Sequence, residues 1–362
     1  MIPLARILDL ARWAPSGDNT QPWRFSIEEP DRVVVFGHDT RDHCVYDLDG
    51  RASQIAIGAL LESIAIAATR FETSAEIARR PASPDNRPVF DVSFRYDPGT
   101  HEDPLAACLE RRCVQRRPMR TTALSVDQKL RLEKAVGSAF GLRWFEGPRQ
   151  RSRVAWLNFK SSYIRLTIPE AFELHRSIIA WNSSTSEDRI PSQALGASAP
   201  TLRLMRWAMA SWARVEMLNH VFAGSLAPRV ELDLIPGLAC AGHCLLIAKS
   251  VPLVLEDYLA VGAALQRFWL TATHLGLQFQ PEYTPLVFAR YAREGRRFSE
   301  SNHAMAAALS IGNRLAKLLG PDVAAKGVFM GRIGFGPAAK ARSLRLPLEQ
   351  LCSLRNQDET DE

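Results

Sequence analysis

The sequence is poor in cysteine, and the few cysteines that it has form no framework. Six occur among 362 residues, without a repeated spacing. A small disulfide-stapled scaffold is therefore excluded, and a reducing compartment is the default expectation. The N-terminal segment carries Arg6 and Asp9 where a secretory peptide needs an unbroken apolar stretch, and no later apolar run is predicted to span a membrane. We expect a cytoplasmic protein.

Several motifs of common enzyme classes are also missing. The chain has neither a phosphate-loop signature nor a G-x-S-x-G nucleophile elbow, and the glycines at 334–337 lack the spacing of a dinucleotide-binding fingerprint. The run 240–244 (C-A-G-H-C) offers three soft ligands, but no second cluster completes a tetrahedral site, so we expect no metal. NTPase, hydrolase and zinc-site interpretations lose their usual support.

The chain does have the size and composition of a folded protein with a substantial core. Hydrophobic residues make up 46% of it, and 45 Lys and Arg against 39 Asp and Glu give a net charge of +6. This length and hydrophobic content exclude a disordered chain. The positive surplus suits a nucleic acid, a membrane surface or an anionic small molecule, and charge alone does not choose among them.

Two apolar, alanine-rich segments resemble one another at an offset of 204 residues, which carries Gly58 to Gly262. The segment 55–69 aligns with 259–273. Segments that are apolar on more than one face are typical of helices buried between layers. A short β-type run precedes each of them, at 33–36 and at 245–248. The pattern predicts an α+β chain made of two degenerate tandem lobes.

The boundary between the lobes is predicted just after residue 102. A Pro-, Asp- and Arg-rich stretch and an extended strand around 89–96 precede it, and a helix is expected to begin near residue 103. We assign 1–102 to the first lobe and 103–362 to the second, with an insertion at 177–240 that has no counterpart in the first. A helix is expected over 201–221, and its apolar side chains favour core packing over a place beside a ligand opening.

Three local sequences stand out as candidate binding segments. Segment 14–23 (A-P-S-G-D-N-T-Q-P-W) offers short polar side chains and backbone N–H groups that suit an uncharged heteroaromatic ring, although an ordinary helix stop has the same composition. Stretch 110–120 holds five arginines, and 340–348 alternates basic and apolar residues. Arginines at this density bind phosphate through paired hydrogen bonds, whereas each stretch alone also fits a solvated face.

Taken together, these segments resemble the motifs of the flavin-dependent nitroreductase superfamily. Segment 14–23 resembles its A-P-S-x-x-N-x-Q-P-W loop, 112–116 its R-x-S-x-R motif with Val114 in place of Ser, and 344–348 its closing basic R-x-P-L segment. In two-subunit members, flavin mononucleotide (FMN) lies at the dimer interface between the loop of one subunit and the basic motifs of the other. One chain carries both here, which is similar to the Acg-like branch of fused proteins. The resemblance implies a nitroreductase-like fold whose two lobes form an intramolecular pseudo-dimer.

The resemblance also implies one FMN site per chain, with a role for each matching residue. Arg112, Arg342 and Arg345 would hold the phosphate, and Arg116 would face the pyrimidine edge of the ring, where positive charge stabilises the reduced flavin. Val114 belongs to the same motif. The remaining implied contacts come from two loops: Pro15, Ser16, Asn19 and Gln21 to the ribityl chain and ring, and Pro281, Glu282 and Tyr283, which include a backbone N–H directed at flavin N5.

The function implied is that of an FMN-dependent oxidoreductase, in which hydride passes through flavin N5 to or from a small organic substrate and NAD(P)H is the candidate electron donor. An alternative is a non-catalytic FMN-binding protein whose flavin is occluded by Met205, Trp207 and Trp212. Nucleic-acid binding is the weakest interpretation, because no stacking-aromatic pattern accompanies the arginines. We expect neither a nucleic-acid nor a membrane partner, and a monomer that acts as a pseudo-dimer, with further oligomerisation left open.

Overall fold

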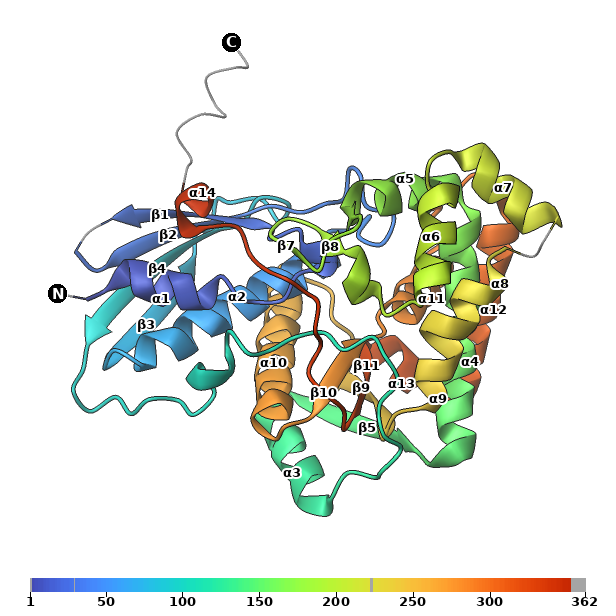
Figure 1. Cartoon of the computed structure of the whole chain (residues 1–362). Helices are drawn as coiled ribbons and strands as arrows, with labels where there is room; N and C mark the ends of the chain where they lie inside the picture. The colour runs from blue at the N-terminus through green and yellow to red at the C-terminus, as the bar shows by residue number, and fades with distance from the viewer. Residues whose placement is uncertain (1, 29, 222–223, 353–362) are drawn as a thin grey trace, which may run out of the picture.

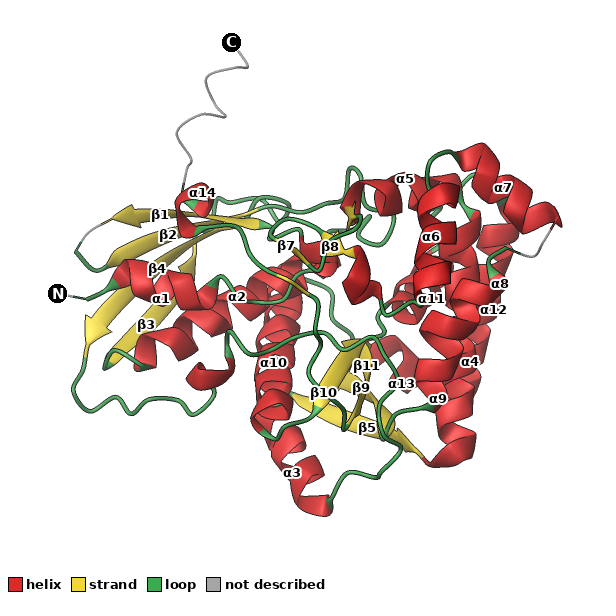
Figure 2. Ribbon diagram, viewed as in Figure 1, coloured by secondary structure: helices red, strands yellow, loops and turns green. Residues whose placement is uncertain are grey.

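The computed structural model describes residues 2–28, 30–221 and 224–352 (Figure 1). Its larger strands form two four-stranded antiparallel sheets, which lie at the left and the lower centre of Figure 2. Helices pack between the sheets and extend to the right of the second one. The mixed α and β class expected from the sequence is confirmed.

The first sheet is built from the N-terminal part of the chain, and its strand order is β1-β2-β4-β3. The β-branched run Val33, Val34 and Val35 is fully buried in the second position of the sheet, where such side chains pack well. The strands expected around 33–36 and 89–96 are both present. The elements are α1 (Leu4–Ala11), β1 (Trp23–Glu28), β2 (Arg32–Gly37), α2 (Arg51–Thr69), β3 (Thr73–Arg79) and β4 (Val89–Tyr96).

The second sheet repeats this arrangement with later elements. Its order, β5-β9-β11-β10, is the same first-second-fourth-third order of successive strands, and a long helix again follows the second strand. The elements are α3 (Val126–Ala135), β5 (Phe140–Glu146), β9 (Gly242–Ala248), α10 (Leu255–His274), β10 (Gln278–Pro281) and β11 (Gly327–Gly334). The repeat detected between 55–69 and 259–273 thus corresponds to equivalent helices beside equivalent sheets.

Helices α2 and α10 cross at the centre of the molecule, and the crossing is reciprocal (Figure 1). A Cβ atom on Gly58 would lie 2.1 Å from the carbonyl oxygen of Leu259, and a Cβ on Gly262 would lie 2.1 Å from that of Ile55. The 204-residue offset carries Ile55 to Leu259, so the two contacts are equivalent, as across a two-fold axis. Glycine is required at both places because the backbones touch.

Helix α2 is long and apolar enough to cross a membrane, contrary to the sequence expectation. Most of it is buried inside the protein, however. Its apolar side chains pack under the first sheet and against α10. Burial on more than one side explains why its sequence is apolar on more than one face.

A large helical addition separates the second unit from the first, at the right of Figure 1. It begins directly after β5, at Gly147, and therefore contains more than the predicted insertion at 177–240. The single helix expected over 201–221 is two helices, α6 and α7, with a break at 209–211. The added α- and π-helices before β9 are α4 (Gly147–Thr167), α5 (Pro169–Ile178), α6 (Ala199–Ala208), α7 (Trp212–Val221), α8 (Leu226–Arg229), the π-helix Val230–Leu234 and α9 (Ile235–Leu238).

Three more helices, absent from the sequence prediction, lie between β10 and β11. They are α11 (Thr284–Glu294), α12 (Asn302–Leu319) and α13 (Pro321–Lys326). Helices α4, α11 and α12 share a separate hydrophobic core with part of the second sheet. The helical addition is therefore a packed layer with its own interior.

The expected core role of the 201–221 region is wrong for most of its side chains. Ala208 is the one buried residue of α6, and α7 has none. Trp207 is 43% exposed and Met217 is 45% exposed. These two helices lie at the outside of the addition (Figure 1).

Two extended segments connect the two sheets. Residues 97–125 lead from the first sheet to the second, where Val114 bridges in parallel to Phe279 on β10. The helix expected near residue 103 is a single 3-10 turn at Ala106–Cys108. The C-terminal segment returns to the first sheet, where α14 (Leu348–Leu351) places Leu351 in the core of that unit. The first sheet thus packs against a segment that follows the last strand of the second sheet.

Candidate functional site

The loop between α1 and β1 has an unusual backbone. Asp18, Asn19 and Gln21 adopt positive φ angles of 51°, 66° and 49°. Non-glycine residues in this region carry conformational strain, which persists when the surroundings hold it. The Gln21 N–H donates to Ser16 Oγ at 3.0 Å, and the Asn19 and Gln21 side chains are buried. Pro15 begins the turn and is half-buried. The loop is thus held in a backbone conformation that its residues rarely adopt.

Three arginines from two distant segments of the chain meet at Trp13 and define what we call the basic cluster. Arg112 donates to the Trp13 carbonyl at 2.8 Å. The Arg342 Cζ lies 4.7 Å from the centre of the Trp13 ring. Arg345 donates from Nε and Nη2 to the Ala14 carbonyl, at 3.0 and 2.8 Å. The structure thereby brings together the three residues for which the sequence predicts a phosphate contact.

The basic cluster carries uncompensated positive charge. None of its three guanidinium groups forms an ion pair with a carboxylate of the described residues, and the Nε atoms of Arg112 and Arg342 are buried without a hydrogen-bond partner there. Burial, with the neighbouring Arg342, lowers the pKa of Arg112 to about 10. Burial also lowers the pKa of Arg345, with Arg112 and Arg342 adding to the effect. An anion at this place would relieve the repulsion and satisfy the free donors.

The side chains of Asn19 and Gln21 tie the loop to two other segments. Asn19 Nδ2 donates to the Glu187 carbonyl at 2.9 Å, and Asn19 Oδ1 accepts from Arg345 Nη1 at 2.8 Å. Gln21 Nε2 also donates to the Glu187 carbonyl, at 2.8 Å, and its Oε1 accepts from the Leu346 N–H at 2.9 Å. In both side chains the amide nitrogen thus donates to the inserted segment, and the amide oxygen accepts from the C-terminal segment.

Arg116 lies beside the same inserted segment. Its Nη1 donates to the Ala194 carbonyl at 3.1 Å, and Arg332 Nη2 donates to the Arg116 carbonyl at 2.7 Å. Gly196 adopts a φ of +87°, and a Cβ there would approach the Arg116 Cβ to 3.1 Å. Burial lowers the pKa of Arg116 to about 10. Residues 187–196 therefore cover both the loop and Arg116, whereas Val114 packs into the second core.

Pro281, Glu282 and Tyr283 lie at the junction of β10 and α11. The Glu282 N–H donates to the Met330 carbonyl at 2.7 Å, so this amide is already used. The Glu282 carboxylate is buried between His243, at 2.6 Å, and Arg332, at 3.1 Å. Tyr283 stacks on Phe329, with ring centres 5.3 Å apart. The segment is held rigidly by the core of the second sheet.

His243, which sequence reasoning missed as an ionic group, is charged. Its Nδ1 faces Glu282, and its Nε2 lies 2.9 Å from the Gly237 carbonyl, so both ring nitrogens face acceptors and both donate. Although burial opposes the charge, Glu282 and Cys240 raise the pKa of His243 to about 10. The only sequence signal was the C-A-G-H-C run, read as an incomplete zinc site.

A second group of polar residues, also missed from the sequence, lies beyond Arg116. Arg165 on α4 has its Cζ 5.9 Å from the Tyr46 ring, and the Tyr46 hydroxyl lies 3.0 Å from His175 Nε2. Burial raises the pKa of Asp18 against the opposing charges of Arg165 and Arg116. Burial, with the charge of Arg165, lowers the pKa of His175 to about 3, so this imidazole is neutral.

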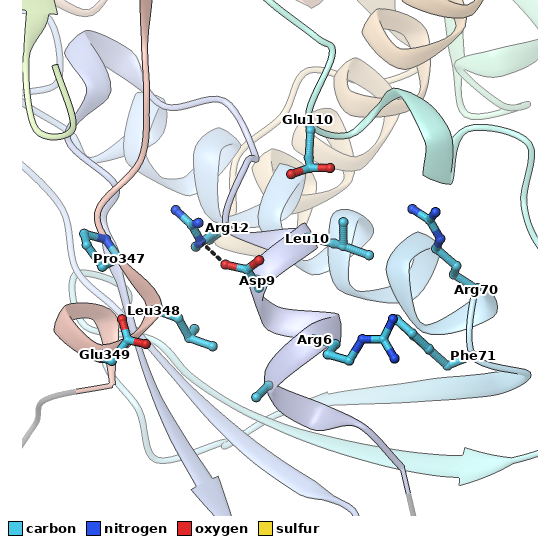
Figure 3. Close-up of a pocket in the computed structure, with 11 residues that line it drawn as sticks. Arg6, Asp9, Leu10, Arg12, Arg70, Phe71, Glu110, Pro347, Leu348 and Glu349 are labelled. Atoms are coloured by element: carbon cyan, nitrogen blue, oxygen red, sulfur yellow. Dashed lines mark hydrogen bonds and ion pairs between the residues drawn. The ribbon is translucent and has the colours of Figure 1, made fainter. Parts of the chain in front are cut away.

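A surface pocket of about 640 Å³ is lined by residues of α1 and α14 (Figure 3). Arg12 pairs with Asp9 at its edge, and Arg6 lies over the ring of Phe71, with 4.9 Å from Cζ to the ring centre. Arg12 also donates to the Leu346 carbonyl at 2.9 Å. The pocket contains none of the predicted site residues. Most of its acidic and basic side chains are exposed, whereas Arg112 and Arg345 of the basic cluster are buried.

No protein-family model matches this chain, and no curated protein matches it. The chemistry of the site is therefore argued from its own residues. Those residues comprise a largely buried cluster of three arginines, a strained polar loop, and a charged region around Arg116. The inserted segment contacts the loop, Arg116 and the strand that carries Arg342.

Proposed function

We propose that the chain is an FMN-dependent oxidoreductase of nitroreductase type. The observation that carries this proposal is the basic cluster, in which three guanidinium groups converge without an ion-paired carboxylate among the described residues. Arg112 and Arg345 are buried, Arg342 is half-buried, and the Nε donors of Arg112 and Arg342 have no partner there. A dianionic phosphate fits such a donor set, because each arginine can give it charge-assisted hydrogen bonds. When bound, FMN would supply hydride transfer at its N5 atom.

The ring would extend from the basic cluster toward Arg116. Arg116 is the next cation along the same segment, and its charge would stabilise the anionic reduced flavin. Pro15, Ser16, Asn19 and Gln21 would line the other side as parts of the strained loop. Tyr283 and its neighbours provide a fixed wall, because the second core holds them in place.

The duplicated architecture supports an intramolecular pseudo-dimer with a single such site. The two sheets have the same strand order, and α2 crosses α10 reciprocally. The loop joining α1 to β1 is residues 12–22, whereas its counterpart between α3 and β5 is residues 136–139. The short link lacks the Pro-Ser and Asn-x-Gln residues of the long one. One complete loop per chain predicts one FMN per chain.

The first test is whether the purified protein binds FMN. We expect a flavin absorbance spectrum, or quenching of added FMN fluorescence, at one equivalent per chain. Arg345→Ala should weaken binding by about 1.5–3 kcal/mol, roughly ten- to hundredfold, because a buried charge-assisted contact is lost. Arg203→Ala, at an exposed position on α6, is the matched control and should bind as the wild type does. A wild-type protein that fails to bind FMN would refute the proposal.

A second candidate is a non-catalytic FMN-binding protein. Residues 187–196 favour it, since their carbonyls accept from Asn19, Gln21 and Arg116 and so cover the site. Of the residues expected from the sequence to occlude the flavin, Trp207 lies against Arg214 and Trp212 against Phe172. Anaerobic addition of NADH or NADPH separates the two functions: rapid bleaching of the bound flavin supports the oxidoreductase, and unchanged absorbance supports the alternative.

A further inference from the structure

The charged region beyond Arg116 has the features of a second ligand site. We call it the inner cluster and define it by five residues from five parts of the chain: Asp18, Arg116, Arg165, Asp233 and Arg332. Arg165 and Arg116 both act on the pKa of Asp18, and Arg165 and Arg332 both act on that of Asp233, so the groups lie close to one another. Arg332 is bonded to the Arg116 backbone and to Glu282.

Opposite charges in the inner cluster approach without touching. No ion pair within 4.0 Å joins Asp18 or Asp233 to a described arginine, and Asp18, Arg116, Arg165 and Asp233 remain partly accessible to solvent. Side chains that were only structural would close into direct pairs, because a separated buried charge is costly. The spacing is that of groups arranged around a bound polar molecule.

The polar face of α4 adds unpartnered hydrogen-bond donors. Asn158 and Arg165 share a face of the helix with Ser162, from which they are four and three residues away, and the Ser162 side chain is hydrogen-bonded to Asp233. Asn158 is 6% exposed and its Nδ2 has no partner, and the Nε atoms of Arg165 and Arg332 are likewise buried and unpartnered among the described residues. Buried donors of this kind are normally satisfied, so they indicate a missing acceptor.

The local charge favours an anion as that acceptor. Five cationic groups face three carboxylates in this region: Arg116, Arg165, Arg229, Arg332 and His243 against Asp18, Asp233 and Glu282. Burial raises the pKa of both Asp18 and Asp233, so it works against the negative charge of these two carboxylates. Tyr46, beside Arg165, brings a hydroxyl group to the same place.

We propose that the inner cluster binds the carboxylate of a small organic acid, with Arg165 as its main anchor. This inference rests on the proposed function, because it makes that acid the substrate held beyond the flavin ring. The proposed substrate class is thereby limited to small organic molecules that carry a carboxylate. Arg165 is a specificity-determining residue in this account, since it contacts the part of the substrate that does not react.

Benzoate and benzamide are suitable probes, since they have nearly the same shape and differ in charge. Binding is measured by calorimetry on the FMN-saturated protein, so that the basic cluster is filled. We expect benzoate to bind at least about tenfold more tightly than benzamide. Arg165→Met should remove this preference and Arg165→Lys should restore part of it, whereas Arg203→Ala, at the exposed surface, should leave it unchanged. Circular dichroism checks that each variant is folded.

Three results would overturn the inference: no benzoate binding, equal binding of benzoate and benzamide, or unchanged benzoate binding in Arg165→Met. These results are distinct from a failure of the proposed function, which the FMN titration reports by itself. If FMN does not bind, the same titrations are made with inorganic phosphate present and repeated on Arg345→Ala. Benzoate binding that is lost in Arg345→Ala and kept in Arg165→Met would assign it to the basic cluster and refute the inner-cluster site.

Discussion

At the scale of single residues, the buried charged side chains of this protein are of two kinds, those without an ionic partner and those with one. Arg112 and Arg345 are less than a tenth exposed and have no carboxylate partner among the described residues. His243 is fully buried too, but it is paired with Glu282 and hydrogen-bonded to the Gly237 carbonyl. Buried charges that lack a partner favour an external anion, whereas paired ones stabilise the fold. We therefore expect the unpaired arginines to affect the binding of an anion, and the pair of His243 and Glu282 to affect how stability depends on pH.

The ionic pair of His243 and Glu282 predicts a specific pH dependence of stability. The pKa of His243 is about 10 in the folded protein and about 6.5 when unpaired. The folded state thus holds an extra proton between these values, so its stabilisation is complete below pH 6.5 and is lost as the pH rises toward 10. The free energy of unfolding should fall by up to about 1.4 kcal/mol per pH unit in that window.

Urea denaturation at pH 6.5 and 9.5, compared between wild type and His243→Gln, measures this effect. Other titrating groups contribute equally to both proteins, so the difference between their slopes isolates His243. The variant should be less stable at pH 6.5, because Glu282 loses one of its two buried partners. Equal pH dependence in the two proteins would contradict a charged His243.

At the scale of elements, the crossing of α2 and α10 brings two helix backbones into direct contact. Gly58→Ala or Gly262→Ala would place a methyl group against a backbone carbonyl, which forces the helices apart. We expect each to lower the free energy of unfolding by about 1–3 kcal/mol or more. Thermal unfolding followed by circular dichroism measures the loss.

Gly312→Ala on α12 is the matched control for these substitutions. A Cβ there would meet its nearest neighbour at 3.7 Å, which is ordinary contact. Because alanine is also the better helix former, this variant should be as stable as the wild type or slightly more so. Equal losses at Gly58 and Gly312 would mean that helix propensity, not close approach, sets the effect.

The elements also show what a sequence pattern can and cannot predict. Strands β2, β4 and β9 and helices α2 and α10 were predictable, because apolar runs and a repeat specify buried elements directly. The basic cluster was predictable from local motifs that carry the arginines. The inner cluster was not, because Arg165 lies on an ordinary helix and meets Asp18 only through tertiary packing. Helices α11 to α13 went unseen because the repeat gives them no counterpart.

At the scale of the whole molecule, the C-terminal segment joins the two sheets into one folding unit. Leu351 of α14 is fully buried in the core of the first unit, although it follows the last strand of the second. Leu351→Ala should cost about 2–5 kcal/mol of stability, as expected for a buried leucine. We expect calorimetry to show a single unfolding transition in wild type and variant alike.

The control for this prediction is Leu309→Ala on α12, where the side chain is 56% exposed and little stability should be lost. Two resolved transitions, with only the first shifted by Leu351→Ala, would show instead that the sheets unfold independently. That outcome would assign α14 to a separately stable N-terminal unit.

The reciprocal contact of Gly58 and Gly262 has a consequence for how this protein can change. In a dimer of identical subunits, every substitution occurs twice, once on each side of the symmetry axis. Here the equivalent positions are separate codons on one chain, so each half is free to vary alone. Residues 136–139 make a short link where residues 12–22 make a strained turn, and the helices before β9 lie in one half only. Covalent duplication thus allows one flank of a symmetric scaffold to specialise in recognition while the other is kept for rigidity.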